Sequence, residues 1–153
     1  MTAVADRLAE LGLELPPLTK PVAAYVPAVV TGNLVFTAGQ LPFVSGTLAA
    51  TGKFGDALGA DDGQALARTC VLNALAAAES VIGSLDRVTR VVKVVAFVAS
   101  TPDFTGQPGV ANGASELLGQ IFGDAGQHAR SAVGVPVLPL DAPVEVELIL
   151  EFA

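Results

Sequence analysis

The sequence is poor in the residues that form disulfides and soft-metal sites. It contains one cysteine, Cys70, and one histidine, His128, which stand far apart along the chain. A single cysteine excludes an intramolecular disulfide and a Cys-X-X-Cys motif. One cysteine and one histidine cannot complete a Cys/His zinc site either. We therefore expect a fold without a disulfide and a site without a metal ion.

Charge is also scarce, and positive charge most of all. Charged residues make up 15% of the chain, and 8 basic side chains against 15 acidic ones give a net charge of −7. Proteins that bind nucleic acid need clustered cations to neutralise phosphates, so this composition disfavours an RNA or DNA partner. Hydrophobic residues reach 52%. A small domain with so few charged residues cannot cover its whole surface with polar groups. We therefore expect the excess apolar surface to be buried between copies of the chain.

No stretch of the sequence is typical of a signal peptide or a membrane span. Asp6, Arg7 and Glu10 stand where a signal peptide has its apolar centre. The uncharged run between Lys20 and Lys53 is interrupted by prolines and glycines, so we do not interpret it as a membrane helix. We expect a soluble, cytosolic protein with no membrane partner.

Periodicity and turn signals divide the chain into helices and strands. We predict a short helix within residues 1–12, a proline-rich connector over 15–21, and two longer helices over 62–83 and 108–122. Alternating and β-branched residues predict strands over 25–30, 33–39, 88–99, 131–135 and 144–152, with a hairpin turn at Gly32-Asn33. Residues 41–60 are an irregular loop or a weak third strand. This order predicts a single α+β domain, 1–153, with helices on one face of a mixed sheet.

One segment resembles a phosphate-binding loop but lacks its spacing. Residues 46–54 place five residues, instead of four, between their two glycines, and Phe54 stands where the loop needs Ser or Thr for magnesium. We interpret the segment as a flexible loop. Asp61 and Asp62 are interpreted as helix caps, and Cys70 as a buried structural thiol.

Arg130 is the first candidate for chemistry, because it is the only ionised residue in the apolar stretch 125–140. A guanidinium is costly to desolvate and therefore needs a partner. On position alone, a ligand carboxylate and a glutamate of this chain are equal alternatives. Glu145, Glu147 and Glu151 alternate with apolar residues along the last strand. They form either a solvated strand face or a group from which one acts as a general base beside Arg130.

Three further side chains could belong to a site or to the structure. Tyr25 is the only tyrosine, and its ring suits core or interface packing as well as ligand binding. Asn112 in the second long helix either bridges structural elements or contacts a ligand. His128, shortly before Arg130, is expected in an exposed loop.

Taken together, four segments resemble the RidA family of reactive enamine/imine deaminases, a YjgF-like family also known as endoribonuclease L-PSP. The segments are Tyr25-Val-Pro-Ala, Gly32-Asn-Leu-Val-Phe-Thr-Ala-Gly-Gln-Leu-Pro42, Ala129-Arg-Ser-Ala-Val-Gly-Val with Leu138-Pro139, and Val144-Glu-Val-Glu147. Each motif is weak alone, but four in order and at the right spacing are specific. The resemblance runs from about residue 19 to 153. The N-terminal helix and the 41–60 segment are similar to a longer, less characterised branch.

The resemblance implies a chorismate-mutase-like fold, a homotrimer with clefts shared between neighbouring subunits, and no cofactor. In the deaminases of this family, the arginine of the Arg-Ser motif binds the substrate carboxylate, and Arg130 matches it. The first glutamate of the last strand orients water, and Glu145 matches it. Tyr25 and Asn112 match substrate-binding positions of the family.

The sequence departs from the family at several site positions. The family's Ser-Gly-Gln is Ala38-Gly39-Gln40 here, and Ala132 replaces the usual cysteine two residues after the arginine. The Gly-Pro before the tyrosine is Ala23-Ala24. Loss of the serine hydroxyl removes a group that would orient the substrate.

The activity implied by the resemblance is hydrolytic deamination of 2-enamine and 2-imino acids to 2-keto acids and ammonia. The alternative is a non-catalytic trimeric module that binds a small carboxylate-bearing metabolite, which the two alanines favour. An endoribonuclease is the third interpretation, and the net charge of −7 and the single histidine argue against it.

Overall fold

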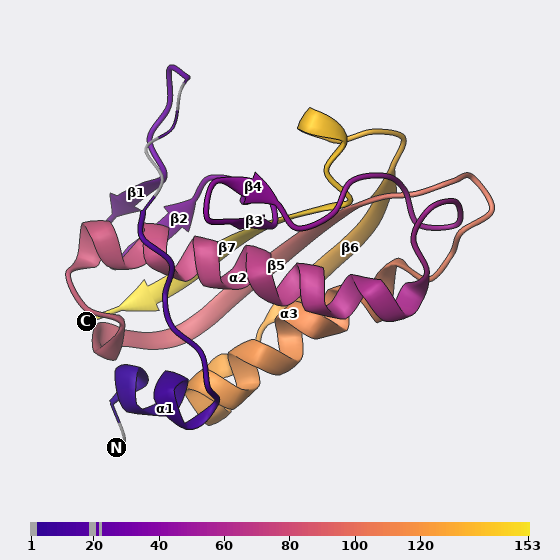
Figure 1. The fold of residues 1–153 in the computed structure, drawn as a ribbon. Coiled ribbons are helices and arrows are strands. Elements are labelled where there is room, and N and C mark those ends of the chain that lie inside the picture. Colours follow the sequence, from indigo (N-terminus) through magenta and orange to yellow (C-terminus); the bar gives the residue numbers. More distant parts are fainter. Residues whose placement is uncertain (1–2, 19–20, 22) are drawn as a thin grey trace.

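A five-stranded mixed sheet forms the centre of the protein, as Figure 1 shows for the computed structural model. The structure describes residues 3–18, 21 and 23–153. The strands are β1 (Ala28–Thr31), β2 (Leu34–Thr37), β5 (Val88–Ala99), β6 (Ala129–Val135) and β7 (Val144–Phe152). Their order is β1-β2-β7-β5-β6, and only β5 and β6 are parallel. A parallel pair needs a long crossover, which helix α3 (Gln107–Phe122) provides.

Two helices cover one face of this sheet and build the core with it (Figure 1). Helix α2 (Ala60–Ile82) begins where the backbone N–H of Gly59 donates to Asp62 Oδ2 at 3.0 Å, and it ends at Gly83, whose φ is +86°. Asp62 therefore caps the helix as predicted, and the glycine supplies the left-handed end. The short helix α1 (Val4–Glu10) adds Val4 and Leu8 to the core. The predicted α+β, chorismate-mutase-like arrangement is confirmed.

By length and composition alone, α2 could cross a membrane. Eleven of its residues are buried, however, among them Leu66, Cys70 and Leu75. Its apolar face packs on the sheet, so α2 is the core helix of this fold. Cys70 has no exposed surface, as predicted for a structural thiol.

Alternation along β7 defines the two faces of the sheet. Val144, Val146, Leu148 and Leu150 are buried under the helices. The residues between them point to the opposite face, which no helix covers in the described part of the chain. We call this second face the open face. The glutamates of β7 therefore belong to the open face, and each of them is half-buried.

The predicted strand over 25–30 starts too early. β1 begins at Ala28, because Pro27 has no N–H to donate to the ladder and Tyr25 lies in a bend before it. Residues just before β1 belong to a segment that projects from the sheet edge (Figure 1). Parts of the predicted connector and of the first twelve residues lie outside the described residues.

The 41–60 segment contains a small second sheet instead of a loop or a single strand. Strands β3 (Phe43–Val44) and β4 (Thr47–Leu48) form a hairpin whose turn carries positive φ at Ser45 and Gly46. The chain also forms three short 3₁₀ helices: η1 (Leu85–Arg87), η2 (Gly123–Gly126) and η3 (Pro139–Asp141). β5 and β7 have the predicted bounds, whereas β6 begins two residues earlier than predicted and so includes Arg130.

Candidate functional site

Arg130 lies on the helix side of edge strand β6 and reaches across to α3. It pairs with the buried Val94, which fixes the face to which its side chain points. Its Nη1 donates to Asn112 Oδ1 at 2.9 Å and to Ser115 Oγ at 3.1 Å. Its Nη2 is 3.5 Å from the carbonyl oxygen of Pro108. Asn112, one of the predicted site residues, therefore lies against Arg130 and bridges α3 and β6.

Every hydrogen-bond partner of the Arg130 guanidinium is a neutral oxygen. Among the described residues, the one ion pair within 4.0 Å joins Arg7 to Glu10 on α1, so no described carboxylate neutralises Arg130. The side chain is nevertheless half-buried. Hydrogen bonds to neutral oxygens do not cancel the positive charge of the guanidinium, so this half-buried group can still bind an anion from solution. Of the two alternatives that the sequence leaves open, an internal glutamate is not the partner within this chain.

His128 lies in the short loop between η2 and β6, as predicted, but the prediction that it is exposed is wrong. His128 is half-buried, with Nδ1 2.6 Å from the carbonyl oxygen of Gly126 and Nε2 2.8 Å from Ser115 Oγ. A carbonyl can only accept, so Nδ1 carries the proton and Nε2 accepts from the Ser115 hydroxyl. The hydroxyl oxygen is thereby turned toward Arg130 as an acceptor. His128 and Ser115 thus extend the network that holds the guanidinium.

Ser115 is the residue of this network that the sequence analysis missed. It stands three residues after Asn112 on α3, so both side chains point from one face of the helix. That spacing is the one signal that could have suggested it. Its contact with His128 depends on the fold, because η2 returns the chain to the helix just before β6 begins.

Glu145 lies on the open face, half-buried beside Gly39. A methyl group at position 39 would overlap Glu145 Oε1 and come within 2.8 Å of Cδ. Because Gly39 has no side chain, the Glu145 carboxylate can occupy the space beside its Cα atom. Burial raises the pKa of Glu145 above its usual value, and the negative charge of Glu147 raises it further. A carboxyl with a raised pKa is suited to take up and release a proton near neutral pH.

Arg130 and Glu145 do not meet within one chain. Glu145 pairs with Phe97 of β5, and Phe97 pairs with Val133 of β6, so these three side chains lie on the open face. Arg130 pairs with Val94 on the helix side. The sheet itself separates the guanidinium from the carboxylate. A site that uses both groups needs a second copy of the chain.

Tyr25 stands apart from both groups. Its side chain is 55% exposed and lies before β1 rather than in a strand. It has no hydrogen-bond partner among the described residues. Its predicted part in ligand binding stays a prediction. The part of the chain that the structure describes also contains no cluster of three or more His, Cys, Asp or Glu side chains with the geometry of a metal site.

Comparison with known proteins decides the family. Residues 5–152 match the family described as "YjgF/chorismate mutase-like, putative endoribonuclease". The chain belongs to this family. It is 46% identical to protein TCP17 of Trypanosoma cruzi over 151 residues, covering 97% of this chain and 93% of that protein.

Two solved structures are similar to this one over nearly the whole chain. Protein Atu1372 from Agrobacterium tumefaciens, described as having unknown function, superposes with a TM-score of 0.92 at 42% identity, covering 98% of this chain and 92% of that one. A protein from Shewanella oneidensis described as "a putative endoribonuclease" gives a TM-score of 0.95 at 32% identity, covering 99% and 100%. The fold of this chain is thus shared with both proteins over 98% or more of its length.

Proposed function

We propose that this protein hydrolyses reactive 2-imino acids, formed from 2-enamino acids such as 2-aminoacrylate, to 2-keto acids and ammonia. The observation that carries the proposal is the Arg130 guanidinium, which is half-buried, oriented by Asn112 and Ser115, and not neutralised by any described carboxylate. A substrate carboxylate can form two parallel charge-assisted hydrogen bonds with it.

Glu145 supplies the base in this scheme. The carboxylate takes a proton from water while the water oxygen bonds to the imine carbon. The carboxyl group returns that proton to nitrogen, which gives a carbinolamine. The proton of the new hydroxyl group then passes to nitrogen through the same carboxylate while the carbon–oxygen double bond forms and the carbon–nitrogen bond breaks, so that ammonia leaves and a 2-keto acid remains. Imines already hydrolyse in water, so general-base assistance of about 10²-fold is sufficient. Each step uses water and two side chains, and the proposal calls on no cofactor.

The same proposal includes a homotrimer, in which Arg130 of one subunit and Glu145 of the next line one cleft. This assembly removes the obstacle that the two groups lie on opposite faces of the sheet. It would also cover apolar side chains that the open face leaves exposed. Val29, Phe36 and Val133 are 53%, 40% and 45% exposed there. A sheet face with such side chains favours burial against another copy.

The activity is tested with 2-aminoacrylate generated enzymatically in the presence and absence of the protein. Release of pyruvate should accelerate at micromolar protein. The Arg130→Met variant should lose the acceleration, because a charge-assisted pair is worth roughly 1.5–3 kcal/mol. Arg68→Met is the matched control, because Arg68 is another half-buried arginine bonded to a neutral oxygen, Gln120 Oε1. No acceleration, or an active Arg130→Met protein, contradicts the proposal.

A mixture of two inactive variants tests the shared cleft. Arg130→Met and Glu145→Gln subunits, unfolded together and refolded at equal amounts, should regain about a quarter of the wild-type rate, because one cleft in four receives both native side chains. Each variant refolded alone should stay inactive. A mixture as inactive as its components would rule out clefts built from both residues across subunits.

A second candidate is a non-catalytic module that binds a small carboxylate. Ala38 and Ala132 favour it, since both leave a methyl group where the family has a polar side chain. Thermal stabilisation by 2-keto acids without turnover of 2-aminoacrylate would support this function. RNA degradation that disappears in Arg130→Met protein would instead indicate the nuclease that the net charge disfavours.

A further inference from the structure

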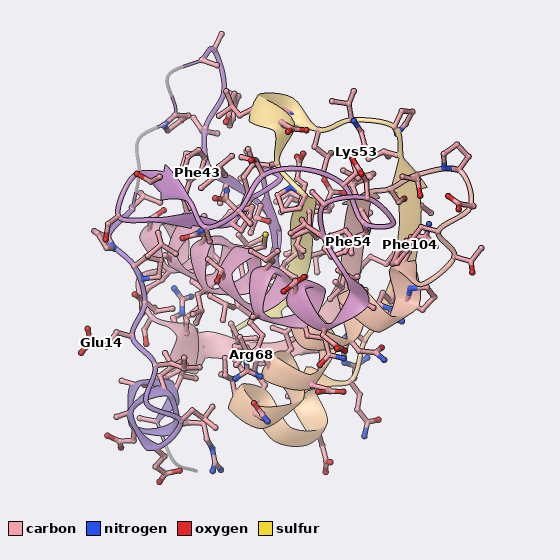
Figure 2. The ribbon with its side chains drawn as sticks, turned by 45° about the vertical axis from the view of Figure 1, so that its right-hand side comes forward. Glu14, Phe43, Lys53, Phe54, Arg68 and Phe104 are labelled. Atoms are coloured by element: carbon pink, nitrogen blue, oxygen red, sulfur yellow. The ribbon has the colours of Figure 1, made fainter. Side chains whose placement is uncertain are left out.

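A cavity of about 530 Å³ lies at the end of β6, outside the site described above. Its apolar wall includes Pro102, Phe104 and Pro136, and its polar groups include Lys53, Thr101 and Gln107. Figure 2 shows Lys53 and Phe104 at the same end of the molecule, with Arg68 away from them. The volume is in the range of pockets that bind small molecules. No group that the proposed reaction uses lines this cavity.

The cavity continues the face of β6 on which Arg130 lies. Alternate residues Arg130, Ala132 and Gly134 share the helix side, because they pair with Val94, Ala96 and Val98, which are all buried. After Arg130, this row continues with Ala132, whose side chain is one methyl group, and then with Gly134, which has no side chain. Arg130 Nη2 lies 3.5 Å from the carbonyl oxygen of Pro108, which belongs to α3. The residue before Pro108 on this helix, Gln107, lines the cavity. Arg130 and the cavity therefore lie along the same strand face and beside the same end of α3, with the methyl group of Ala132 between them packed against the core.

Gly134 keeps the cavity open on the β6 side. A methyl group there would come within 2.7 Å of Ser100 Oγ and 2.8 Å of Gln107 Nε2. These two atoms are already hydrogen-bonded to each other at 3.2 Å. Any side chain at position 134 would therefore enter the space that they border. Gly134 has no positive φ, so backbone conformation does not require a glycine here.

Among the described residues, Lys53 is the only charged one in the lining of the cavity. It is half-buried, and no carboxylate among the described residues lies within 4.0 Å of its amine. Asp103 accepts a hydrogen bond from Thr101 nearby, but its carboxyl group is fully exposed and does not line the cavity. An ammonium group beside apolar walls selects a ligand with an apolar chain and an anionic end.

We propose that this cavity receives the side chain of a 2-imino acid that carries a second, terminal carboxylate. Arg130 binds the carboxylate beside the imine, the chain extends along β6 toward Gly134, and Lys53 binds the terminal carboxylate. The inference rests on the proposed function and names its substrate class. The reaction is unchanged, since the second carboxylate takes no part in the bond making and breaking at the imine carbon.

Isothermal titration of the full chain with three keto acids tests the inference. The probes are pyruvate, 2-oxohexanoate and 2-oxoadipate, and the last two differ only in the terminal carboxylate. We expect 2-oxoadipate to bind most tightly. Lys53→Met should weaken 2-oxoadipate binding about five- to tenfold and leave the other two within about twofold. Arg68→Met, which removes a half-buried cation elsewhere, should change none of the three.

A second variant keeps the test independent of the lysine. Gly134→Ala should weaken both six-carbon acids and spare pyruvate, because it fills the cavity and not the guanidinium site. Equal affinity for 2-oxoadipate and 2-oxohexanoate, or no effect of Lys53→Met, overturns the inference. Arg130-dependent pyruvate binding with turnover would leave the proposed function standing in that case. Failure of all three ligands to bind, together with no turnover, would reject the proposed function itself.

Discussion

Gly39 offers the sharpest test of the base, because its missing side chain makes room for Glu145. In a Gly39→Ala variant, the new methyl group would overlap Glu145 Oε1 and lie 3.0 Å from Cγ. The glutamate is long and half-buried, so it can rotate away at small cost. Gly39 does not have positive φ, so alanine fits the backbone. The substitution therefore displaces one carboxylate and leaves the fold intact.

The expected effect is on the rate and not on binding. General-base catalysis contributes typically about 10²–10⁴-fold, so hydrolysis of 2-aminoacrylate should fall about 100-fold or more. Pyruvate affinity, which depends on Arg130, should stay within about twofold. The melting temperature should drop by less than about 4 °C, the change that roughly 1 kcal/mol produces in a domain of this size.

Gly119→Ala is the matched control. Gly119 lies in α3, and a methyl group there would meet no atom within 4 Å. Alanine is favoured over glycine inside a helix by roughly 0.5–1 kcal/mol, so this variant should melt slightly higher and keep its rate. Full activity in Gly39→Ala protein would refute the reasoning, because it would mean that the present position of the Glu145 carboxylate does not matter.

Three further outcomes follow from the network and the core. Glu147→Gln removes the charge that helps to raise the pKa of Glu145, so the limb where the rate rises with pH should move to lower pH; Glu79→Gln on α2 should not move it. Ser115→Ala removes one oxygen that holds the guanidinium, and pyruvate binding should weaken about fivefold, a loss of about 1 kcal/mol. Burial raises the pKa of Cys70, so a thiol reagent should label it only after denaturation.

Each of these outcomes has a result that contradicts it. A pH profile unchanged by Glu147→Gln would show that Glu145 is not the titrating base. Unchanged pyruvate affinity in Ser115→Ala protein would show that the hydroxyl does not position the guanidinium. Rapid labelling of the native thiol would contradict its place under the sheet.

The strands that matched their prediction are those that local sequence specifies most strongly. β5 is a run of β-branched residues between turn signals, and β7 alternates between apolar residues and glutamates except at Ile149. α2 carries its own start and stop signals in Asp62 and Gly83. In each case the residues of the element and those directly beside it carry enough information to place its ends.

The errors occurred where the outcome depends on a distant partner. β1 could not begin at Tyr25, because its ladder with β2 starts only after Pro27. The loop residue His128 was expected to be exposed, but it is half-buried because it contacts a serine on α3 and a carbonyl of η2. Contacts between elements of this kind follow from packing, which no local pattern in the sequence records.

The separation of Arg130 from Glu145 likewise follows from how the strands pair and not from a local sequence pattern. It determines how the site must work. Arg130 stands opposite Val94 and Glu145 opposite Phe97, so their partners on β5 are three positions apart, an odd offset. Successive side chains of a strand alternate between faces, and a register shift of one residue would have placed the two groups on the same face. Rotation of either side chain cannot carry it through the sheet. Either a neighbouring copy brings the second group to each substrate, as the mixture of inactive subunits tests, or the two residues act on different molecules.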